Sequence, residues 1–186
     1  QQGRLNDTHT KYDEQEIAEI RWQEYRTANT SMLRETCQLV GGFDEELPAA
    51  EDTEFASRLS FLRMRFIFVA DIQVVHHHPI TPSGFFNKGS MYGEAVALWY
   101  KKSPELRHTL ISRYGVFAPE MTRVKKIKYI IRALVINRLT VPLISASGHV
   151  MRAIWFECSD MLYVSVFRYH VRKAFRTRLM FDQKGF

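Results

Sequence analysis

The fold is decided by residues 27–78, TANTSMLRETCQLVGGFDEELPAAEDTEFASRLSFLRMRFIFVADIQVVHHH. The polar start of this stretch predicts a turn, followed by a helix from about residue 31 to residue 39 with Thr30 or Ser31 as N-cap. Gly41 and Gly42 are expected to end this helix, because glycine tolerates the left-handed conformation that helix ends often need. Phe43 is expected to be buried beside the turn that they form.

The second half of the stretch predicts a helix and two strands. Phe55, Leu59 and Leu62 are spaced so that they share one face of a helix from about residue 52 to residue 62. The apolar runs 66–70 and 72–75 predict two short strands.

Helices are also predicted after this stretch. Thr81-Pro82 is a typical helix start, with Thr81 as N-cap and Pro82 as the first helical residue. Ser103-Pro104 repeats the signal for a shorter helix that ends near Arg113. Residues 115–119 predict a linker.

The C-terminal third changes in composition. Residues 124–139 are basic and aliphatic, Pro142 interrupts them, and a long helix is predicted at about 149–179. Charged residues break every long apolar run, which favours an interfacial amphipathic helix pair over a spanning helix.

Charge is distributed unevenly along the chain. Residues 1–120 hold 13 Lys or Arg against 17 Asp or Glu, a net charge of −4, whereas residues 121–186 hold 13 against 3, a net charge of +10. Together they give the formal net charge of +6. A basic tail on an acidic body predicts an anionic partner, either membrane lipid or nucleic acid.

Length and cysteine content set further limits. A chain of 186 residues can form one domain or slightly more. The two cysteines, Cys37 and Cys158, are too few for a disulfide framework, and a reducing cytoplasmic setting is the simpler inference. The polar first residues contain no secretory signal.

Glu51 and Asp52 are the first candidates for chemistry. A carboxylate at the start of a helix is stabilised by the positive end of the helix, and it can act as a base that takes a proton from an alcohol. Acidic residues at a helix start can equally serve as caps, with Glu51 and Glu54 solvated around Asp52. The local pattern leaves both interpretations open.

Histidines and polar turn residues are the remaining candidates. His76, His77 and His78 end a predicted strand and could ligate a divalent metal or lie in a surface loop. Asn29 could bind a ligand hydroxyl or stabilise its own turn.

Several short motifs occur in a fixed order over about residues 27–106. They are Ala28-Asn29 with Arg34, Gly41-Gly42-Phe43-Asp44-Glu45, Glu51-Asp52-Thr53-Glu54-Phe55 with Arg58-Leu59, Val74-Val75-His76-His77-His78-Pro79, Tyr92-Gly93 and Lys102-Ser103-Pro104. As a set, this order resembles the acceptor side of family 2 glycosyltransferases of the GT-A fold, which are inverting enzymes that use nucleotide-sugar donors. The sequence departs from the pattern at residues 47–50, where such enzymes often have an aromatic residue and a glycine.

The resemblance implies a role for each site residue. Asp52 is expected to be the catalytic base, with Glu51 beside it as a supporting or acceptor-binding acid. The predicted substrate-binding residues are Thr27, Asn29 and Arg58. His76 is expected to complete the coordination of Mg²⁺ or Mn²⁺, which would assist the departing nucleotide diphosphate.

The resemblance also predicts the organisation of the chain. Residues 1–80 would be the C-terminal part of a GT-A catalytic domain, an α/β fragment of a Rossmann-like fold with short strands and flanking helices. Residues 81–118 would be its trailing helices and residues 119–186 a mainly α-helical, basic, amphipathic region. No Asp-x-Asp motif is present, so a nucleotide-binding half is expected upstream of Gln1, and the chain alone is expected to be inactive.

These observations predict two classes of function. The first is transfer of a sugar to a glycan or lipid-linked acceptor. Such an enzyme is expected in the cytoplasm, peripherally at the inner face of the membrane, where an anionic surface would contact residues 121–186. No nucleic acid is expected as a partner of such an enzyme. The alternative is a non-catalytic basic helical module that binds a membrane surface, nucleic acid or a partner protein. A metal hydrolase built on Glu51 and the histidines is a weaker third interpretation.

Overall fold

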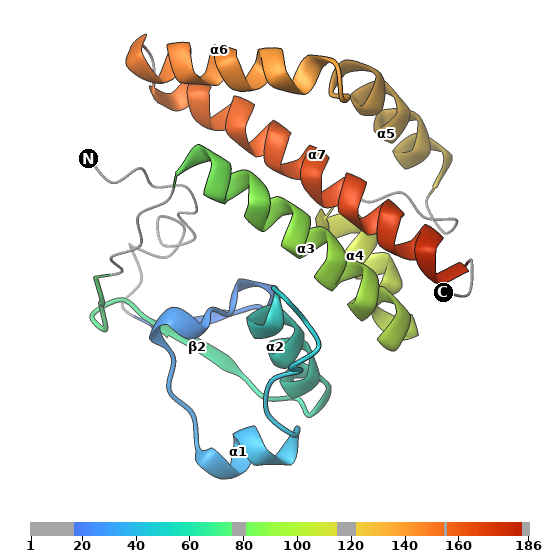
Figure 1. Cartoon of the computed structure of the whole chain (residues 1–186). Helices are drawn as coiled ribbons and strands as arrows, with labels where there is room; N and C mark the ends of the chain where they lie inside the picture. Colours follow the sequence, from blue (N-terminus) through green and yellow to red (C-terminus); the bar gives the residue numbers. More distant parts are fainter. Residues whose placement is uncertain (1–16, 76–80, 115–121, 155, 184–186) are drawn as a thin grey trace. The chain divides into compact units, whose positions relative to one another are not determined.

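The computed structural model describes residues 17–75, 81–114, 122–154 and 156–183 (Figure 1). The protein is mostly helical, with one small antiparallel sheet. The chain divides into two compact units. Unit 1 comprises residues 1–46 and 50–79, and unit 2 comprises residues 47–49 and 80–186.

Unit 1 contains the sheet and short helices. In chain order its elements are β1 (Ile17–Ile20), the 3₁₀ helices η2 (Trp22–Glu24) and η3 (Thr27–Asn29), then α1 (Arg34–Leu39), α2 (Glu51–Phe61) and β2 (Phe66–Val69). The strands β1 and β2 pair antiparallel, with Ile17 opposite Val69 and Ile20 opposite Phe66. The core of this unit is formed by Tyr25, Phe55, Ala56 and Leu59, with Trp22, Cys37, Val40 and Phe66 packed around it.

Most of the elements predicted in this part of the chain are confirmed. α2 begins and ends within one residue of its predicted bounds, and β2 covers most of the predicted strand at 66–70. α1 begins only at Arg34, and no side chain caps it. Gly41 and Gly42, at φ 77° and 71°, have the left-handed conformation predicted for them.

Three predictions for unit 1 are wrong. Neither Thr30 nor Ser31 is the N-cap of the first helix, because α1 begins at Arg34 and its N-cap residue is Leu33. Residues 72–75 form no strand. The four residues of β1 are paired with β2, and the carbonyl of Ile72 accepts a hydrogen bond from the side chain of Asn29 instead of from a strand. Phe43 is 44% exposed rather than buried, although its ring lies 4.6 Å from that of Phe55.

Unit 2 is built from helices. Its elements are α3 (Pro82–Lys102), η4 (Pro104–Leu106), α4 (Arg107–Tyr114), α5 (Arg123–Val135), α6 (Thr140–Ile154) and α7 (Phe156–Gln183). The start of α3 is confirmed as predicted, because the Thr81 hydroxyl accepts a hydrogen bond of 3.1 Å from the backbone N–H of Gly84. The signal at Ser103-Pro104 produces a 3₁₀ turn before α4, and Ser103 makes no side-chain cap. The predicted linker at 115–119 lies outside the described residues.

The single long helix predicted at 149–179 is wrong. α6 ends at Ile154 and α7 begins at Phe156, and the two helices pack against each other. The Cα of Gly148 on α6 faces Tyr163 on α7 so closely that a Cβ there would lie 3.2 Å from the ring. Pro142 does not separate two helices; it lies in the first turn of α6, where a missing N–H costs little.

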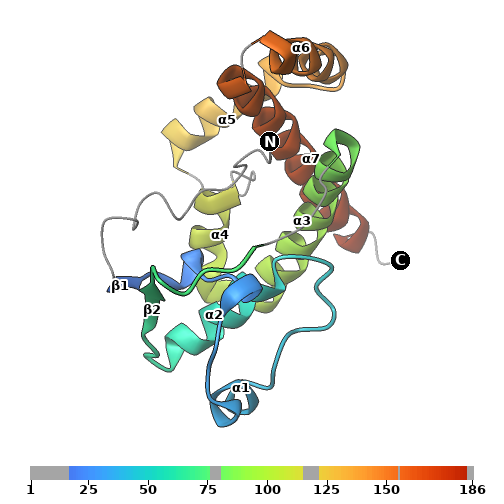
Figure 2. The ribbon, with the colours of Figure 1, turned by 90° about the vertical axis from the view of Figure 1, so that its left-hand side faces the viewer.

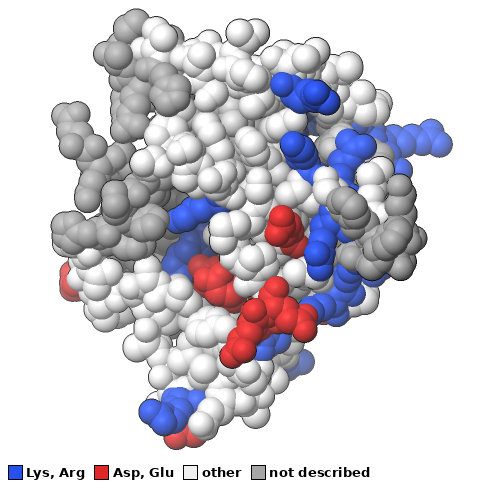
Figure 3. All heavy atoms as spheres, in the orientation of Figure 1, with Lys and Arg blue, Asp and Glu red and all other residues white. Residues whose placement is uncertain are grey.

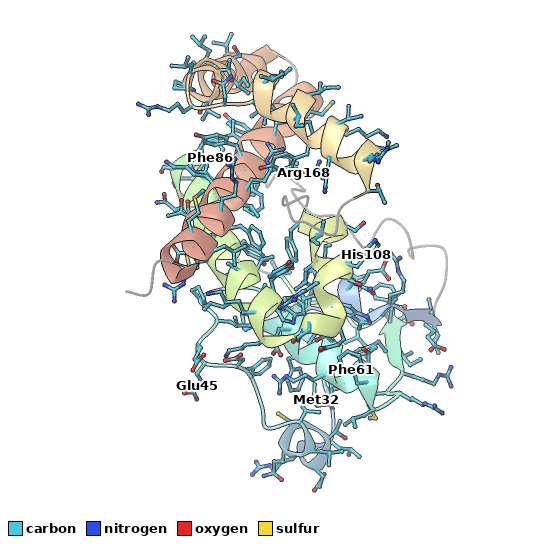
Figure 4. The ribbon with its side chains drawn as sticks, turned by 90° about the vertical axis from the view of Figure 1, so that its right-hand side faces the viewer. Met32, Glu45, Phe61, Phe86, His108 and Arg168 are labelled. Carbon is cyan, nitrogen blue, oxygen red and sulfur yellow. The ribbon has the colours of Figure 1, made fainter. Side chains whose placement is uncertain are left out.

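α7 lies between α3 and α6 (Figures 1 and 2). Its contact with α3 passes through Gly89 and Gly93, where the two backbones approach closely. A Cβ on Gly89 would lie 2.9 Å from the carbonyl oxygen of Phe167, and one on Gly93 would collide with the carbonyl oxygen of Val171. Aromatic side chains fill the flanks of this contact: Phe86, labelled in Figure 4, stacks on His170 with 5.9 Å between ring centroids.

The close contact predicts that Gly93→Ala lowers the free energy of unfolding by about 1–3 kcal/mol, because the added methyl group forces α3 and α7 apart. Urea unfolding of the two proteins measures the difference. Gly84→Ala is the matched control: Gly84 is an exposed residue of α3 whose added Cβ would meet only the Thr81 side chain, so the change should stay within about 1 kcal/mol. An equal loss in both variants would show that the close contact of Gly93 with α7 is not responsible, because a change from glycine to alanine within a helix raises helix propensity in both.

Candidate functional site

Tyr25 is the residue around which the candidate site is organised. Its ring is buried and lies 6.2 Å from that of Phe55 on α2 and 5.6 Å, edge to face, from that of Phe66 on β2. Such aromatic pairs contribute about 0.5–1.5 kcal/mol each beyond the apolar area they bury. The two contacts hold the segment before η3 against both α2 and β2.

Asn29 connects η3 to the segment after β2. Its Nδ2 donates a hydrogen bond of 2.8 Å to the carbonyl oxygen of Ile72, across 43 residues of sequence. Thr27 is exposed at the start of the same 3₁₀ turn. The predicted substrate-binding turn therefore lies beside the chain that leads towards His76.

Asp52 lies in the first turn of α2 and is half-buried, whereas Glu51 is exposed. One oxygen of Asp52, Oδ1, accepts hydrogen bonds from the backbone N–H of Thr53 at 2.6 Å and from the Thr53 hydroxyl at 3.1 Å. Within the described part of the chain, the other oxygen, Oδ2, has no hydrogen-bond partner. The carboxylate is thus oriented through one oxygen, and the second is able to accept a proton.

Ala50 precedes these acids in an unusual backbone conformation. It has φ 60° and ψ 14°, the left-handed region that a residue with a Cβ rarely adopts, and it is buried. This conformation costs on the order of 1–3 kcal/mol and occurs preferentially at functional sites. Ala50 is the N-cap residue of α2 and belongs to the stretch 47–50, where the sequence departs from the resembling pattern.

Asp52 also acts electrostatically on Tyr25. Burial is the main reason why the pKa of the Tyr25 phenol is raised above its ordinary value of 10.0. A hydrogen bond with the Thr30 side chain opposes this shift, and the negative charge of Asp52 adds to it. Two residues that are far apart in the sequence, one before η3 and one on α2, are therefore close enough for their charges to interact.

Arg58 is held within unit 1. Its Nε and Nη2 donate to the two carboxylate oxygens of Glu54, each at 2.8 Å, and Nη2 also donates to the carbonyl oxygen of Gly42 at 2.6 Å. Nη1 donates to the carbonyl oxygen of Val40. These bonds join α2 to the end of α1 and the glycine turn, and they give Arg58 a structural role; its role in substrate binding stays a prediction.

His76, the predicted metal ligand, lies outside the described residues, as do His77 and His78. Among the residues that the structure does describe, no three His, Cys, Asp or Glu side chains are grouped closely enough to hold a metal ion. The predicted Mg²⁺ or Mn²⁺ therefore has no ligand set within the described part of unit 1.

The sequence reasoning missed Tyr25 and Ala50. An aromatic residue in an otherwise polar segment, just before the turn at residues 27–30, is the signal that could have identified Tyr25. For Ala50, the signal was the departure of residues 47–50 from the resembling pattern.

Comparison of the chain with models of known protein families gave no match, and neither did comparison with curated proteins or with solved structures. The arrangement of side chains is therefore the basis on which function is considered.

The contacts of Arg58 predict that Arg58→Ala lowers the free energy of unfolding, because it leaves the buried carboxylate of Glu54 without its cation. We expect a loss of about 2–3 kcal/mol, less than for a fully buried pair because 29% of the Arg58 side chain is exposed. Urea unfolding measures it. Arg65→Ala removes an exposed pair with Glu19 and should cost no more than about 1 kcal/mol; equal losses would contradict the structural role of Arg58.

The proximity of Asp52 and Tyr25 predicts a pH effect. Because folding raises the pKa of Tyr25, the phenol stabilises the folded state fully below pH 10.0, and this stability is lost as the pH rises through the folded-state pKa. In Asp52→Asn the Tyr25 phenol should ionise at lower pH than in the original protein. Phenolate absorbance, taken as the difference from Tyr25→Phe, reports this titration.

Glu51→Gln is the control for this titration. Glu51 is exposed and is not among the groups that shift the pKa of Tyr25, so the curve should not move. A curve that moves in neither variant would show that the charge of Asp52 does not reach the phenol.

Proposed function

We propose that this chain forms the acceptor side of an inverting glycosyltransferase of the GT-A type, with Asp52 as the base. The observation that supports the proposal is the packing of Tyr25 in unit 1. Its ring contacts Phe55 on α2 and Phe66 on β2, and Asn29, four residues further along the chain, donates a hydrogen bond to the carbonyl oxygen of Ile72 after β2. The segment that contains Thr27 and Asn29 is thus attached to α2, the helix that begins with Glu51 and the half-buried Asp52.

The proton transfer assigned to Asp52 fits its surroundings. Asp52 lies in the first turn of α2 and is half-buried. Thr53 fixes one carboxylate oxygen, which leaves Oδ2 to take the proton of the acceptor hydroxyl. The acceptor oxygen then bonds to the anomeric carbon as the bond from that carbon to the nucleotide diphosphate breaks, with inversion.

Other residues of the site would position the acceptor. Glu51 is exposed beside Asp52 and can accept hydrogen bonds from sugar hydroxyls, and Thr27, exposed on η3, can donate to them or accept from them. The Asn29 amide group donates through Nδ2 to Ile72 and still has its oxygen for a ligand. A glycan or a lipid-linked sugar offers such hydroxyls.

The leaving group is the part of the reaction that these residues do not serve. A divalent metal, Mg²⁺ or Mn²⁺, would neutralise the departing diphosphate as a Lewis acid, with His76 as one ligand. The nucleotide-sugar donor would be held by a nucleotide-binding half that supplies the remaining ligands. The contribution of the described residues is to orient the acceptor and to remove its proton.

The proposal predicts the effect of Asp52→Asn on turnover. The variant is placed in a protein in which a nucleotide-sugar-binding half, read from the gene upstream of Gln1, precedes this chain. We expect sugar transfer to fall by about 10²–10⁴-fold, because the amide cannot accept the acceptor proton. Donor affinity, measured by calorimetry, should change little, since Asp52 serves the acceptor.

Folding effects are separated from catalysis by the choice of variant. Asparagine is nearly isosteric with aspartate, and its side-chain oxygen still accepts from Thr53, so the melting temperature should be maintained. Transfer at the original rate in a folded Asp52→Asn protein would remove Asp52 as the base. A gene that encodes no nucleotide-binding half upstream would contradict the proposed assembly.

A further inference from the structure

α5 exposes its aliphatic side. Six of its side chains are between 52% and 72% exposed, namely Val124, Ile127, Ile130, Ile131, Leu134 and Val135. Their spacing of three and four residues places them on one face of the helix. A soluble protein usually buries such a stripe, and a contiguous exposed one marks an interaction surface.

The opposite side of α5 is the one turned towards the rest of unit 2. The residues of this side that are only half-exposed are Lys126, Tyr129 and Ala133. The guanidinium of Arg172 on α7 lies over the ring of Tyr129, 5.7 Å from its centroid. α5 is therefore attached through its less apolar side, which leaves the aliphatic face directed away from α7.

The exposed apolar surface continues beyond α5. Leu139 is 78% exposed, Leu143 69% and Val150 61%, and the last two lie on α6. Among the described residues, no single helix is both long and apolar enough to cross a membrane. One pair of helical segments is long and apolar enough when its two members are taken together. The pair is Lys126–Val135 with Thr140–Gly148, and it is bent by 75°.

Positive charge lies next to this surface. Arg132 on α5 and Arg168 on α7 are each close enough to Arg172 on α7 for their charges to act on it, and Figure 4 labels Arg168. Burial is the main cause that lowers the pKa of Arg172; the charge of Tyr129 opposes the shift, and the charges of Arg132 and Arg168 add to it. No ion pair joins these arginines to an acidic side chain whose position the structure describes. In Figure 3, Lys and Arg gather over α5 and the end of α7, whereas the surface over α6 is largely uncharged.

We propose that α5, together with the start of α6, docks on the surface of a bilayer that contains anionic phospholipids. The aliphatic face of α5 enters between the headgroups, and the exposed Arg132 and Arg168 bind lipid phosphates. Buried Arg172 adds positive potential behind them. This inference stands independently of the proposed sugar transfer.

Two features favour a bilayer over another protein as the occupant. The six exposed side chains of the α5 face are all aliphatic and include none of the aromatic anchors that are enriched in protein interfaces. A helix of 13 residues is about 20 Å long, too short to span a bilayer but suited to lie in its interface with cations at the edges of the apolar face.

Flotation of the full chain with phosphatidylcholine vesicles, with and without phosphatidylserine, tests the proposal at about 0.1 M salt. We expect binding to the anionic vesicles, and we expect Ile131→Ser/Leu134→Ser to weaken it by roughly tenfold or more. Leu33→Ser/Leu39→Ser is the matched control: both leucines are 72% exposed, as Leu134 is, but they lie in unit 1, so binding should be retained.

The charge contribution is tested separately. Arg132→Gln/Arg168→Gln should weaken binding to anionic vesicles by roughly fivefold for each charge removed, and should leave the weak binding to neutral vesicles unchanged. Both arginines are exposed, so the variant is expected to fold.

Three results would overturn the proposal. One is equal binding of the original protein to anionic and neutral vesicles, and another is unchanged binding after the Ile131 and Leu134 substitutions. The third is sedimentation of the original protein as a dimer that fails to bind vesicles and that the same substitutions convert to a monomer. That result would assign the α5 face to a second copy of the chain.

Discussion

The aromatic contacts of Tyr25 with Phe55 and Phe66 are the interaction on which the candidate site depends. Together with Trp22, which packs against the same core, they attach the segment before η3 to α2 and β2 beyond Ile20, where the pairing of the four-residue strand β1 ends. The same ring brings a neutral phenol close to the charge of Asp52. Packing and electrostatics in unit 1 therefore meet at one side chain.

Unit 2 depends on a different constraint, the close approach of α3 and α7 at Gly93. Because glycine lets the two backbones touch, the long helix α7 has one side occupied by α3 and another by α6. α5 is then attached at the margin of this layer, where Arg172 lies over the ring of Tyr129. The exposure of its aliphatic face follows from this arrangement and provides the surface for which a bilayer is the proposed partner.

Predictions that rested on local chemistry were confirmed more often than those that needed a partner. The Thr81 cap and the left-handed Gly41 and Gly42 depend on neighbours within a few residues, and the structure shows all of them. A strand at 72–75 needs a neighbouring strand with an unpaired edge, and the four residues of β1 are already paired with β2. The carbonyl oxygen of Ile72 accepts a hydrogen bond from the Asn29 side chain instead. The helix at 149–179 had continuous apolar periodicity, which cannot show whether a helix runs on or folds back.

The sequence by itself determined the starts of α2 and α3, the uneven charge and the identity of the acids at the beginning of α2, because each of these follows from a few adjacent residues. Only the tertiary structure decided that Arg58 is engaged by Glu54 and two backbone carbonyls. It also decided that the apolar face of α5 is directed away from α7. The physical reason is that burial and pairing depend on what lies across from a residue in space, and periodicity along the chain contains no information about that neighbour.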